Sequence, residues 1–407
     1  MIIWAIAVAA CAYQALAMVA CARFRAKAVS RPRPLARISH QPGVETSLDA
    51  AGTSACATGL EDRLSCSARG AGSQPAASRL VGTPSFPASI LKPVHGLDEG
   101  LAPAIESHSK LDGEYELLCG VRSLNDPAAA LIARFPRARV IECRTRTPNG
   151  KVGTLIDLAR EACHDVLIVN DADIRVHPDY LRRVTAHLRD PEVGLVTCLY
   201  RADGSTLAAR FEALGVACDF APSVLLGWLL GMQEFAGGST LAFRRADLDR
   251  IGGFETIADY LADDYQLGRR LRALGLKCVL SEAIVSTHLG GGWREVWAHQ
   301  VRWARTIRVS NFAGYVTLPI TFATVWAIVA AFAGNWIAAA GILGVRIIMA
   351  LEAGWATMGS RDVRRLWFLI PLRDLFAAAV WAAGLLGHAV TWRGQRLQID
   401  SEGRIRC

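Results

Sequence analysis

The sequence predicts an α/β domain with a mostly parallel sheet, flanked by membrane segments. Between residues 87 and 310, short apolar strands alternate with amphipathic helices, which is typical of a parallel sheet covered by helices on both faces. Long apolar segments lie near both ends of the chain. The composition is 52% hydrophobic and 20% charged, with a mean hydropathy of +0.25. It is too apolar for a typical soluble enzyme and too charged for a simple membrane bundle.

The net charge of +8 is compatible with two kinds of partner. Nucleic acid is one, but the arginines are spread out and form no stripe interleaved with aromatic residues. A membrane protein with positive cytoplasmic loops and an anionic substrate explains the charge as well, so we expect no nucleic-acid partner. The 11 cysteines include no Cys-x-x-Cys pair, which argues against a zinc site and a disulfide framework and favours a reducing cytosol.

Residues 1–22 are almost wholly apolar and are followed by Arg23, Arg25 and Lys27. Their length matches the roughly 20 residues that span a bilayer core. The positive charges after the segment predict an uncleaved anchor whose C-terminal end faces the cytoplasm, with a cleaved signal peptide as the alternative. Residues 23–86 are rich in Ala, Ser, Gly, Arg and Pro and lack a periodic apolar pattern, which predicts a disordered linker.

The α/β domain is predicted over residues 87–310. Its expected elements, in chain order, are strands at 88–94, 114–121 and 138–143, a helix at 150–163, a strand from 166, a helix opened by Pro178, and a strand at 193–200. In sheets of this kind ligands bind beyond the carboxyl ends of the strands. Polar residues that follow a strand are therefore candidate site residues.

Asp171 and Asp173 follow the buried apolar strand that begins at Val166. A carboxylate pair in this place can cap a helix, form salt bridges or bind a metal. Hard cations prefer oxygen ligands, and Mg²⁺ is usually held by one or two carboxylates plus substrate phosphates. The pair therefore indicates a site where Mg²⁺ or Mn²⁺ bridges a nucleotide diphosphate, with the cap and the salt bridge as alternatives.

Three further groups follow the same logic. Asp126 comes after the second predicted strand, where a ribose or uridine could bind. Asp263 and Asp264 begin a helix that follows a glycine-rich turn and a strand, although acids are favoured at any helix N-terminus. Arg302 and Trp303 lie on a helix near the predicted membrane boundary, where they could bind phosphate or anchor the helix in the interface.

Several other residues are weaker candidates. Lys151 begins a predicted helix and indicates contact with a nucleotide or its phosphates, with an ordinary exposed lysine as the alternative. His299 lies three residues before Arg302, on the same helix face, and could contact the diphosphate or the acceptor. His288 precedes a glycine-rich loop that could close over a donor. Residues 220–232 are apolar but too short to span a membrane, which predicts an interfacial segment or a buried core helix.

Residues 311–392 predict C-terminal membrane or interfacial helices in three segments, 312–334, 335–359 and 368–392. Charged residues interrupt the second and third segments: Arg346, Glu352, Arg373 and Asp374. These segments either lie partly in the interface or pair their charges inside the bundle. If every segment crosses, the basic tail of residues 393–407 ends outside, against the positive-inside tendency.

Residues 89–308 resemble the family-2-type inverting glycosyltransferases with a GT-A fold, within their ceramide glucosyltransferase-like branch. The resemblance rests on the stretches SILKPVHGLDEGL, NGKVGTLIDLA, NDADIRVHPDYL, VGLVTCLY, LADDYQLG and HQVRWARTIR. DADIRV, TCLYR and HQVRWARTIR together are most similar to the hopanoid-associated subgroup. Two departures stand out: His299 occupies the first position of the motif Gln/Arg-x-x-Arg-Trp, and Ser123 and Asn125 stand where ceramide enzymes tend to carry acids.

The resemblance implies a multi-pass enzyme of the bacterial inner membrane with its catalytic domain in the cytoplasm. It would transfer N-acetylglucosamine from its UDP donor to the terminal hydroxyl of bacteriohopanetetrol, with ceramide glucosylation from UDP-glucose as the alternative. A processive polysaccharide synthase shares the fold but usually has more membrane helices and an intact Gln-x-x-Arg-Trp motif. A non-catalytic, membrane-anchored lipid-binding protein would not require these acids in this order.

The resemblance also implies roles for individual residues. Asp264 is the expected general base, since burial beside Asp263 would raise its pKa from an ordinary value of about 3.9. Adjacent helix residues point about 100° apart, so Asp263 is expected to support Asp264 or bind a sugar hydroxyl. Asp171 and Asp173 would hold the metal. The residues expected to bind the donor are Asp126, Lys151, Asp171, His299, Arg302 and Trp303.

Overall fold

The structure, a computed structural model, describes residues 2–30, 85–232, 236–387, 389–392 and 395–406. Most of the predicted linker, residues 31–84, lies outside the described residues. The predicted anchor is longer than expected, because helix α1 (Ile2–Ser30) continues past residue 22. Its basic residues therefore belong to the last turns of the helix.

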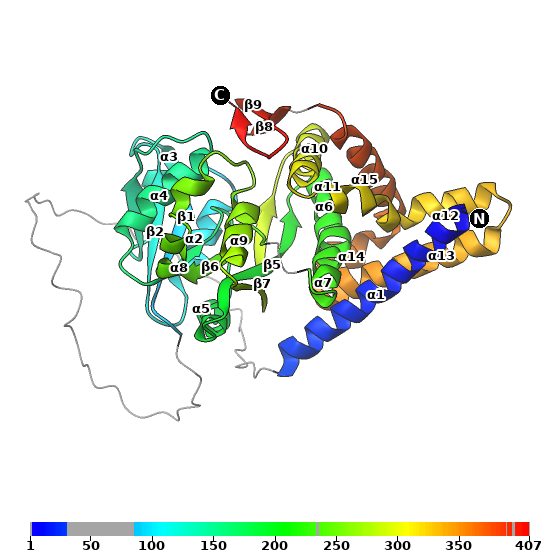
Figure 1. Cartoon of the computed structure of the whole chain (residues 1–407), viewed down its shortest axis with the longest axis horizontal. Coiled ribbons are helices and arrows are strands. Elements are labelled where there is room, and N and C mark those ends of the chain that lie inside the picture. Colours follow the sequence, from blue (N-terminus) through cyan, green and yellow to red (C-terminus); the bar gives the residue numbers. More distant parts are fainter. Residues whose placement is uncertain (1, 31–84, 233–235, 388, 393–394, 407) are drawn as a thin grey trace, which may run out of the picture. The chain divides into compact units, whose positions relative to one another are not determined.

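The central domain, whose strands are drawn as arrows in Figure 1, contains a mixed sheet of seven strands. Their order is β3-β2-β1-β4-β6-β5-β7. Four neighbouring strands, β3, β2, β1 and β4, run parallel. Strand β6 is antiparallel to both β4 and β5, whereas β5 and β7 are parallel. The predicted α/β class with a mostly parallel sheet is thus confirmed. The strands are β1 (Ala88–Pro93), β2 (Tyr115–Val121), β3 (Ala138–Glu142), β4 (Val166–Val169), β5 (Val193–Gly204), β6 (Leu241–Arg244) and β7 (Lys277–Leu289).

The helices of this domain connect the strands and continue toward the C-terminal region. They are α2 (Leu101–Ser109), α3 (Pro127–Ile132), α4 (Gly150–Glu161), α5 (Tyr180–Thr185), the 3₁₀ helix η2 (Ala186–Arg189), α6 (Leu207–Gly215), the π-helix η3 (Val216–Phe220), α7 (Ala221–Leu229), α8 (Arg245–Arg250), the 3₁₀ helix η4 (Phe254–Ile257), α9 (Asp263–Ala273) and α10 (Trp293–Ser310). Residues 220–232 are therefore no isolated segment. Residues 220–229 form the end of the apolar helix Leu207–Leu229, which is mostly buried and, at 23 residues, is long enough to cross a membrane, unlike the short segment predicted. The interfacial position and the buried core helix both stay predictions.

The described residues contain four helices, including Leu207–Leu229, that are long and apolar enough to cross a membrane, or five if one bent pair counts as a span. The bent pair, Phe312–Thr321 and Ala323–Phe332, turns by 53°. The C-terminal helices are α11 (Phe312–Thr317), the 3₁₀ helix η5 (Leu318–Thr321), α12 (Ala323–Phe332), α13 (Trp336–Ala350), the π-helix η6 (Leu351–Thr357), α14 (Arg361–Leu366), the 3₁₀ helix η7 (Trp367–Leu369) and α15 (Ile370–Gly384).

The interrupting charges form ion pairs within the helical region, in agreement with one of the two predictions. The buried Arg346 guanidinium binds the Asp374 carboxylate at 2.7 Å and Asp219 at 2.5 Å. Glu352 pairs with Arg25 of α1. Because these charges neutralise one another, helices that carry them can pack in apolar surroundings.

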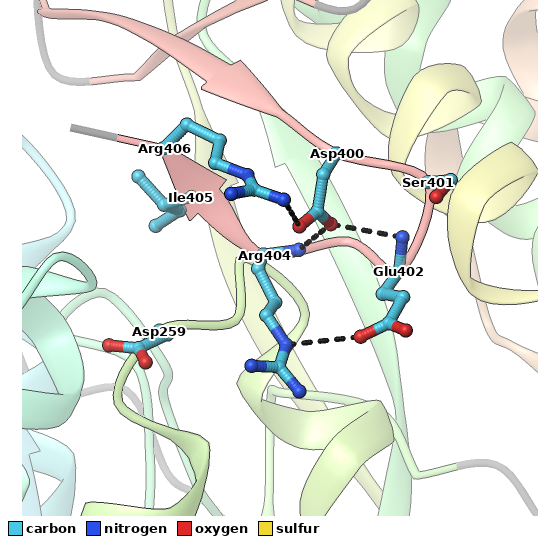
Figure 2. Close-up of a pocket in the computed structure, with 7 residues that line it drawn as sticks. All are labelled: Asp259, Asp400, Ser401, Glu402, Arg404, Ile405 and Arg406. Atoms are coloured by element: carbon cyan, nitrogen blue, oxygen red, sulfur yellow. Dashed lines mark hydrogen bonds and ion pairs between the residues drawn. The ribbon is translucent and has the colours of Figure 1, made fainter.

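The C-terminal segment differs from the prediction. Helix α15 ends at Gly384, short of the membrane segment predicted up to residue 392. Three short strands follow, two of them within the predicted basic tail: β8 (Ala389–Trp392), β9 (Gln395–Ile399) and β10 (Ile405–Arg406). They pair antiparallel in the order β10-β9-β8. Figure 2 shows part of β9, the turn and β10. Alternation of apolar and polar residues in QRLQI is the strand pattern that the prediction missed.

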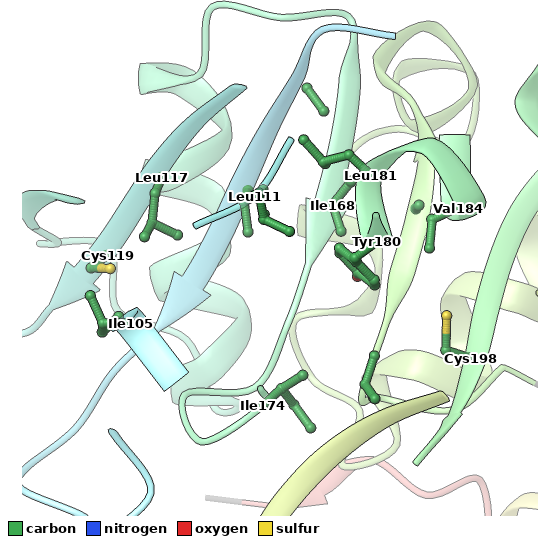
Figure 3. Close-up of a cluster of buried hydrophobic side chains, with 14 of the residues drawn as sticks. Ile105, Leu111, Leu117, Cys119, Ile168, Ile174, Tyr180, Leu181, Val184 and Cys198 are labelled. Atoms are coloured by element: carbon green, nitrogen blue, oxygen red, sulfur yellow. The ribbon is translucent and has the colours of Figure 1, made fainter. Parts of the chain in front are cut away.

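The sheet has a core on each face because neighbouring strand residues point to opposite sides. Ile90 of β1 packs with residues of α2, α3 and α5, in the cluster of Figure 3. Leu91, the next residue, packs with residues of α4, α8 and α9 on the other face. Strands β1 and β4 are parallel neighbours, so their carboxyl ends lie side by side. The site residues begin there.

Candidate active site

A buried lysine fixes the loop that carries Asp171 and Asp173. Lys92 is fully buried in β1, and its Nζ donates hydrogen bonds to the backbone oxygens of Asp171 at 2.8 Å and Ile174 at 3.3 Å. Burial lowers the pKa of Lys92 to about 8, although Asp173 and Asp171 oppose the shift. The loop after β4 is thus held from beneath by a positive charge.

Asn170 fixes the same loop from the side. Its buried amide nitrogen donates to the Ser239 carbonyl at 2.7 Å and to the Thr240 hydroxyl at 3.1 Å. Its Oδ1 lies 3.3 Å from His108 Nε2, and burial lowers the pKa of this histidine to about 3. The neutral ring carries one N–H, which can go either to Asn170 Oδ1 or to the Ala104 carbonyl, 2.9 Å from Nδ1. The loop thus rests on a buried polar network.

Lys151 lies between two acids and is not an ordinary exposed lysine. Its Nζ is 2.9 Å from Asp171 Oδ1 and 3.2 Å from Asp263 Oδ2. Burial disfavours the charged ammonium, but these carboxylates outweigh burial and hold the pKa of Lys151 above its ordinary value. Asn149 caps α4 by accepting the N–H of Lys151 at 3.0 Å, so the start of the helix positions the lysine.

Asp264 faces the same space. A Cβ placed on Gly238 would lie 3.1 Å from Asp264 Oδ2 and 3.7 Å from Asp171 Oδ2. Burial raises the pKa of Asp264 to about 7; Asp263 adds to the shift and Lys151 opposes it. The expected cause, burial beside Asp263, is therefore present.

Asp173 lies where the end of β7 meets the start of α2. Its carboxylate accepts a hydrogen bond from the Thr287 hydroxyl, and burial raises its pKa, with a further contribution from Asp171. A Cβ on Gly100 would lie 2.9 Å from Asp173 Cβ and 3.0 Å from His288 Cβ. His288 thus belongs to β7 and packs beside Asp173, with its Nε2 3.0 Å from Glu99. Its predicted part in a lid is not tested by these contacts.

The acidic residues fit a divalent cation by charge and donor type. The site holds four carboxylates and two lysines, Lys92 and Lys151, so the negative charges are not fully neutralised. The four acids of this acidic cluster are Asp171, Asp173, Asp263 and Asp264. Carboxylate oxygens are the ligands that hard cations prefer. Among the described residues, one group of three has all its ligand atoms within 4.8 Å of one another. That group, Glu116 with Cys163 and His164, lies at the opposite edge of the sheet. Within the described part of the chain, no three carboxylates of the acidic cluster meet this distance, so a cation there would need further ligands such as diphosphate oxygens.

Asp126 is a helix cap as well as a candidate ligand. Its Oδ1 accepts the N–H of Ala128 at 2.9 Å, at the start of α3. Its Oδ2 accepts the N–H of Gly96 at 3.0 Å. The residue therefore ties the loop after β1 to the start of α3. Its contact with the nucleotide stays a prediction.

His299 is held by an acid that the sequence analysis did not single out. Glu212 of α6 is buried, and its Oε1 lies 2.6 Å from His299 Nδ1. The same oxygen accepts a hydrogen bond from Gln300 Nε2 at 2.7 Å. The His299 and Trp303 rings are 4.6 Å apart. Arg302 lies on the same helix and is half-buried, and its contact with phosphate stays a prediction.

The acids of both groups, Glu212 and the acidic cluster, act on the pKa of Tyr200. Burial raises the pKa of this β5 side chain well above its ordinary value, and the negative charges of Glu212, Asp171, Asp264 and Asp173 add to the shift. The phenol therefore lies within electrostatic range of both groups. The structure thus brings together five of the predicted site residues: Lys151, Asp171, Asp173, Asp263 and Asp264. His299 instead contacts Glu212.

Comparison with known proteins identifies the family. Residues 53–405 match the family described as Glycosyl transferase family 21. The chain belongs to this family. Ceramide glucosyltransferase 1 of Caenorhabditis elegans is 23% identical over 346 residues, which cover 79% of this chain and 74% of that protein. Ceramide glucosyltransferase 3 of the same organism is 24% identical over 339 residues, which cover 78% and 73%.

A solved structure is also similar. It is a mannosyltransferase from Pyrobaculum calidifontis in complex with GDP-Man and Mn²⁺, which aligns with a TM-score of 0.47 at 19% identity and covers 75% of this chain and 90% of that chain. Family membership confirms that the protein is a hexosyltransferase related to the ceramide glucosyltransferases. The hopanoid subgroup stays a prediction.

Three site residues of this family 21 enzyme escaped the sequence analysis: Lys92, Tyr200 and Glu212. Two of them carried a visible signal. Lys92 is a charge inside the apolar strand ASILKP, and Glu212 is a charge inside the apolar run that begins at Leu207. A buried charge requires a partner, so an isolated one in an apolar element marks a polar site.

Proposed function

We propose that this family 21 enzyme transfers a sugar from a UDP-sugar to the terminal hydroxyl of a membrane lipid, with inversion at the anomeric carbon. The observation that carries the proposal is Asp264, a carboxylate with a pKa raised to about 7 beside the acidic cluster. A base with a pKa near the working pH combines a useful ionised fraction with useful basicity.

The proposed reaction is a direct displacement. The lipid oxygen forms a bond to the anomeric carbon as the bond from that carbon to the diphosphate oxygen breaks. The hydroxyl proton moves to Asp264, and UDP leaves with the electrons of the broken bond. Asp263, which pairs with Lys151 at 3.2 Å, keeps the start of α9 fixed while this occurs.

The donor would lie over the loop after β4. Asp171 and Asp173 would hold Mg²⁺ or Mn²⁺, which when bound neutralises charge on the diphosphate. Lys151 adds a positive charge to the site, and Arg302 would supply a fork of donors to phosphate oxygens. Asp126, near the end of the neighbouring strand β2, is the proposed contact for the uridine or its ribose.

The contacts of the C-terminal strands support a topology in which the tail shares the side of the catalytic domain. Leu261, just before α9, donates its N–H to the Gly403 carbonyl at 3.1 Å. The chain between α10 and β8 must then cross the membrane an even number of times. We therefore propose that α12 with its bent partner and α13 cross as a pair, and that α14 and α15 lie at the interface. Labelling of a cysteine at Gly334 and one at Ser401 from opposite sides would test this.

Two lipid acceptors are in competition, and a different observation favours each. The DADIRV, TCLYR and HQVRWARTIR stretches favour bacteriohopanetetrol with UDP-N-acetylglucosamine. The similarity to ceramide glucosyltransferases of Caenorhabditis elegans favours ceramide with UDP-glucose. Mass spectrometry of lipids from cells lacking the protein separates them: loss of an aminosugar hopanoid supports the first, and loss of a hexosylceramide supports the second.

The catalytic proposal is tested with purified enzyme in both donor and acceptor combinations. Asp264→Asn should lower kcat about 100- to 10,000-fold, the usual contribution of a general base. Asp249→Asn, a change of the same kind at an exposed residue at the end of α8, is the control. Full activity of Asp264→Asn would refute the assignment of the base.

A further inference from the structure

The loop that delivers the proposed base is held by the C-terminal strands. Residues 259–262 lie between η4 and α9, directly before Asp263 and Asp264. The backbone of this loop pairs with the chain around β10: Leu261 N–H donates to the Gly403 carbonyl at 3.1 Å, and Ile405 N–H donates to the Asp259 carbonyl at 2.7 Å. Tyr260 and Arg404 form an antiparallel bridge between these two bonds.

Side chains strengthen the same contact. The guanidinium carbon of Arg404 lies 5.2 Å from the centre of the Tyr260 ring. Leu261 is buried in one apolar cluster with Val390, Ile399 and Ile405, one or more from each C-terminal strand. Figure 2 shows the surface pocket that Asp259 lines together with the turn and β10.

Both neighbours of this contact belong to the candidate site. On one side, Asn149, which caps the helix of Lys151, donates its side-chain N–H to the Tyr260 carbonyl at 2.7 Å. On the other, Arg305 and Arg308 of α10 donate to the carbonyls of Leu386 at 3.0 Å and Gly387 at 2.6 Å, just before β8. The C-terminal sheet thus connects the helix of His299 and Arg302 to the loop of Asp264.

We propose that the C-terminal sheet is a positioning element of the active site. It fixes residues 259–262 and so sets the direction of Asp264 relative to the donor. A misplacement of about 1 Å between reacting groups can cost roughly 100-fold in rate. Loss of the sheet is therefore expected to lower kcat. The donor contacts proposed on the loops after β2 and β4 are separate from the contact between the sheet and residues 259–262, so donor binding should change little. The expected effect of the sheet on kcat rests on the proposed function. Its expected effect on hydrogen exchange in the loop does not.

The experiment compares two truncations of the full-length protein in detergent. One ends at Glu402 and loses the partners of both Asp259 and Leu261. The other ends at Ile405, keeps both partners, and is the matched control. We expect the first to lower kcat about 100-fold with the KM for the UDP-sugar within about twofold, and the second to behave as wild type. Hydrogen exchange at residues 259–266 should accelerate in the first alone.

A point variant repeats the test with little risk to folding. Arg404→Ala removes the cation from the Tyr260 ring and should lower kcat about threefold, the size expected for an exposed cation–π contact. Arg404→Lys should restore part of the rate. Arg406→Ala, the same change at a more exposed arginine that pairs with Asp400, should have no effect.

The outcomes separate the two hypotheses. Wild-type kcat in the chain that ends at Glu402, or a loss shared equally by the chain that ends at Ile405, overturns the positioning role. Hydrogen exchange at residues 259–266 that stays slow in the chain that ends at Glu402 also overturns the positioning role. By contrast, activity of Asp264→Asn together with fast exchange in the truncated loop would refute the proposed base and leave the contact between sheet and loop established.

Discussion

Two groups of charged residues lie in this molecule, and they differ in balance. In the acidic cluster, Asp171, Asp173, Asp263 and Asp264 outnumber the lysines near them, and the Asp171 side chain is 44% exposed. In the helical region, Arg346 and Arg373 meet Asp219 and Asp374, so that charges of each sign are equal. The acidic cluster therefore has a net negative charge at a place that solvent can reach. The group in the helical region is balanced in charge.

The difference separates a site from a structural network. A carboxylate that is buried among other carboxylates has a raised pKa, as Asp173 and Asp264 do, and the unbalanced charge favours a cation or a proton donor from outside. A balanced set of buried charges instead fixes how helices pack. The helical network also reaches His299, because Arg373 donates to Gln300 Oε1 at 3.0 Å and Gln300 donates to Glu212, the partner of His299.

The largest predicted effect comes from unbalancing the structural network. Arg346→Met should destabilise the protein by about 3–5 kcal/mol, because it leaves a fully buried Asp374 without its cation. Arg364→Met, at an exposed position on α14, serves as the control. Thermal unfolding in detergent measures both. The double variant Arg346→Met with Asp374→Leu should recover part of the loss, and failure to do so would contradict a role through charge pairing.

In the acidic cluster, the next effect falls on activity and not on stability. Asp173→Asn should lower kcat/KM by about 100- to 1,000-fold, since one carboxylate ligand of the cation that neutralises the diphosphate is lost, while the melting temperature stays close to wild type. The concentration of Mg²⁺ or Mn²⁺ needed for half-maximal rate should rise. An unchanged metal requirement would indicate that Asp173 is no ligand and that its bond to Thr287 is its main role.

The same comparison explains which features could be predicted from the sequence. Strand and helix alternation predicted the α/β domain, because buried parallel strands need apolar runs. Asp171, Asp173 and Asp264 were recognisable because carboxylates that follow a strand or start a helix are conspicuous. Both kinds of signal are local in the chain, so one sequence is enough to find them.

What escaped prediction depends on contacts between distant segments. Glu212 and His299 are 87 positions apart, and their hydrogen bond arises only once α6 and α10 pack together. The C-terminal strands were mistaken for a membrane segment and a tail because the apolar run before them ends without a strong break. Their partner, the loop of Leu261, lies more than a hundred residues earlier. No local pattern encodes that pairing.

A smaller effect should appear in the pH dependence of stability. The folded-state pKa of Asp264 is raised to about 7, against an ordinary value of about 3.9 in the unfolded chain. Between these values the folded protein binds the extra proton, so the free energy of unfolding falls as pH rises through this window. Asp264→Asn has no carboxyl group at this position, so its free energy of unfolding does not fall for this reason. Its melting temperature in EDTA should exceed wild type by a margin that widens from pH 5 to pH 8; a margin that narrows would contradict the raised pKa.

The smallest effect concerns Lys151, the lysine that pairs with Asp171 and Asp263 of the acidic cluster. Lys151 lowers the pKa of Asp264, so Lys151→Met should raise that pKa and move the acidic limb of the kcat profile to higher pH, by about one unit or more. Lys110→Met, at an exposed lysine that pairs with Glu106, should leave the profile in place. Kinetics at saturating donor between pH 5.5 and 9 would measure both. If the limb stays where it is while the rate falls at every pH, Lys151 acts on the phosphates alone and the balance of charge around Asp264 is set by other groups.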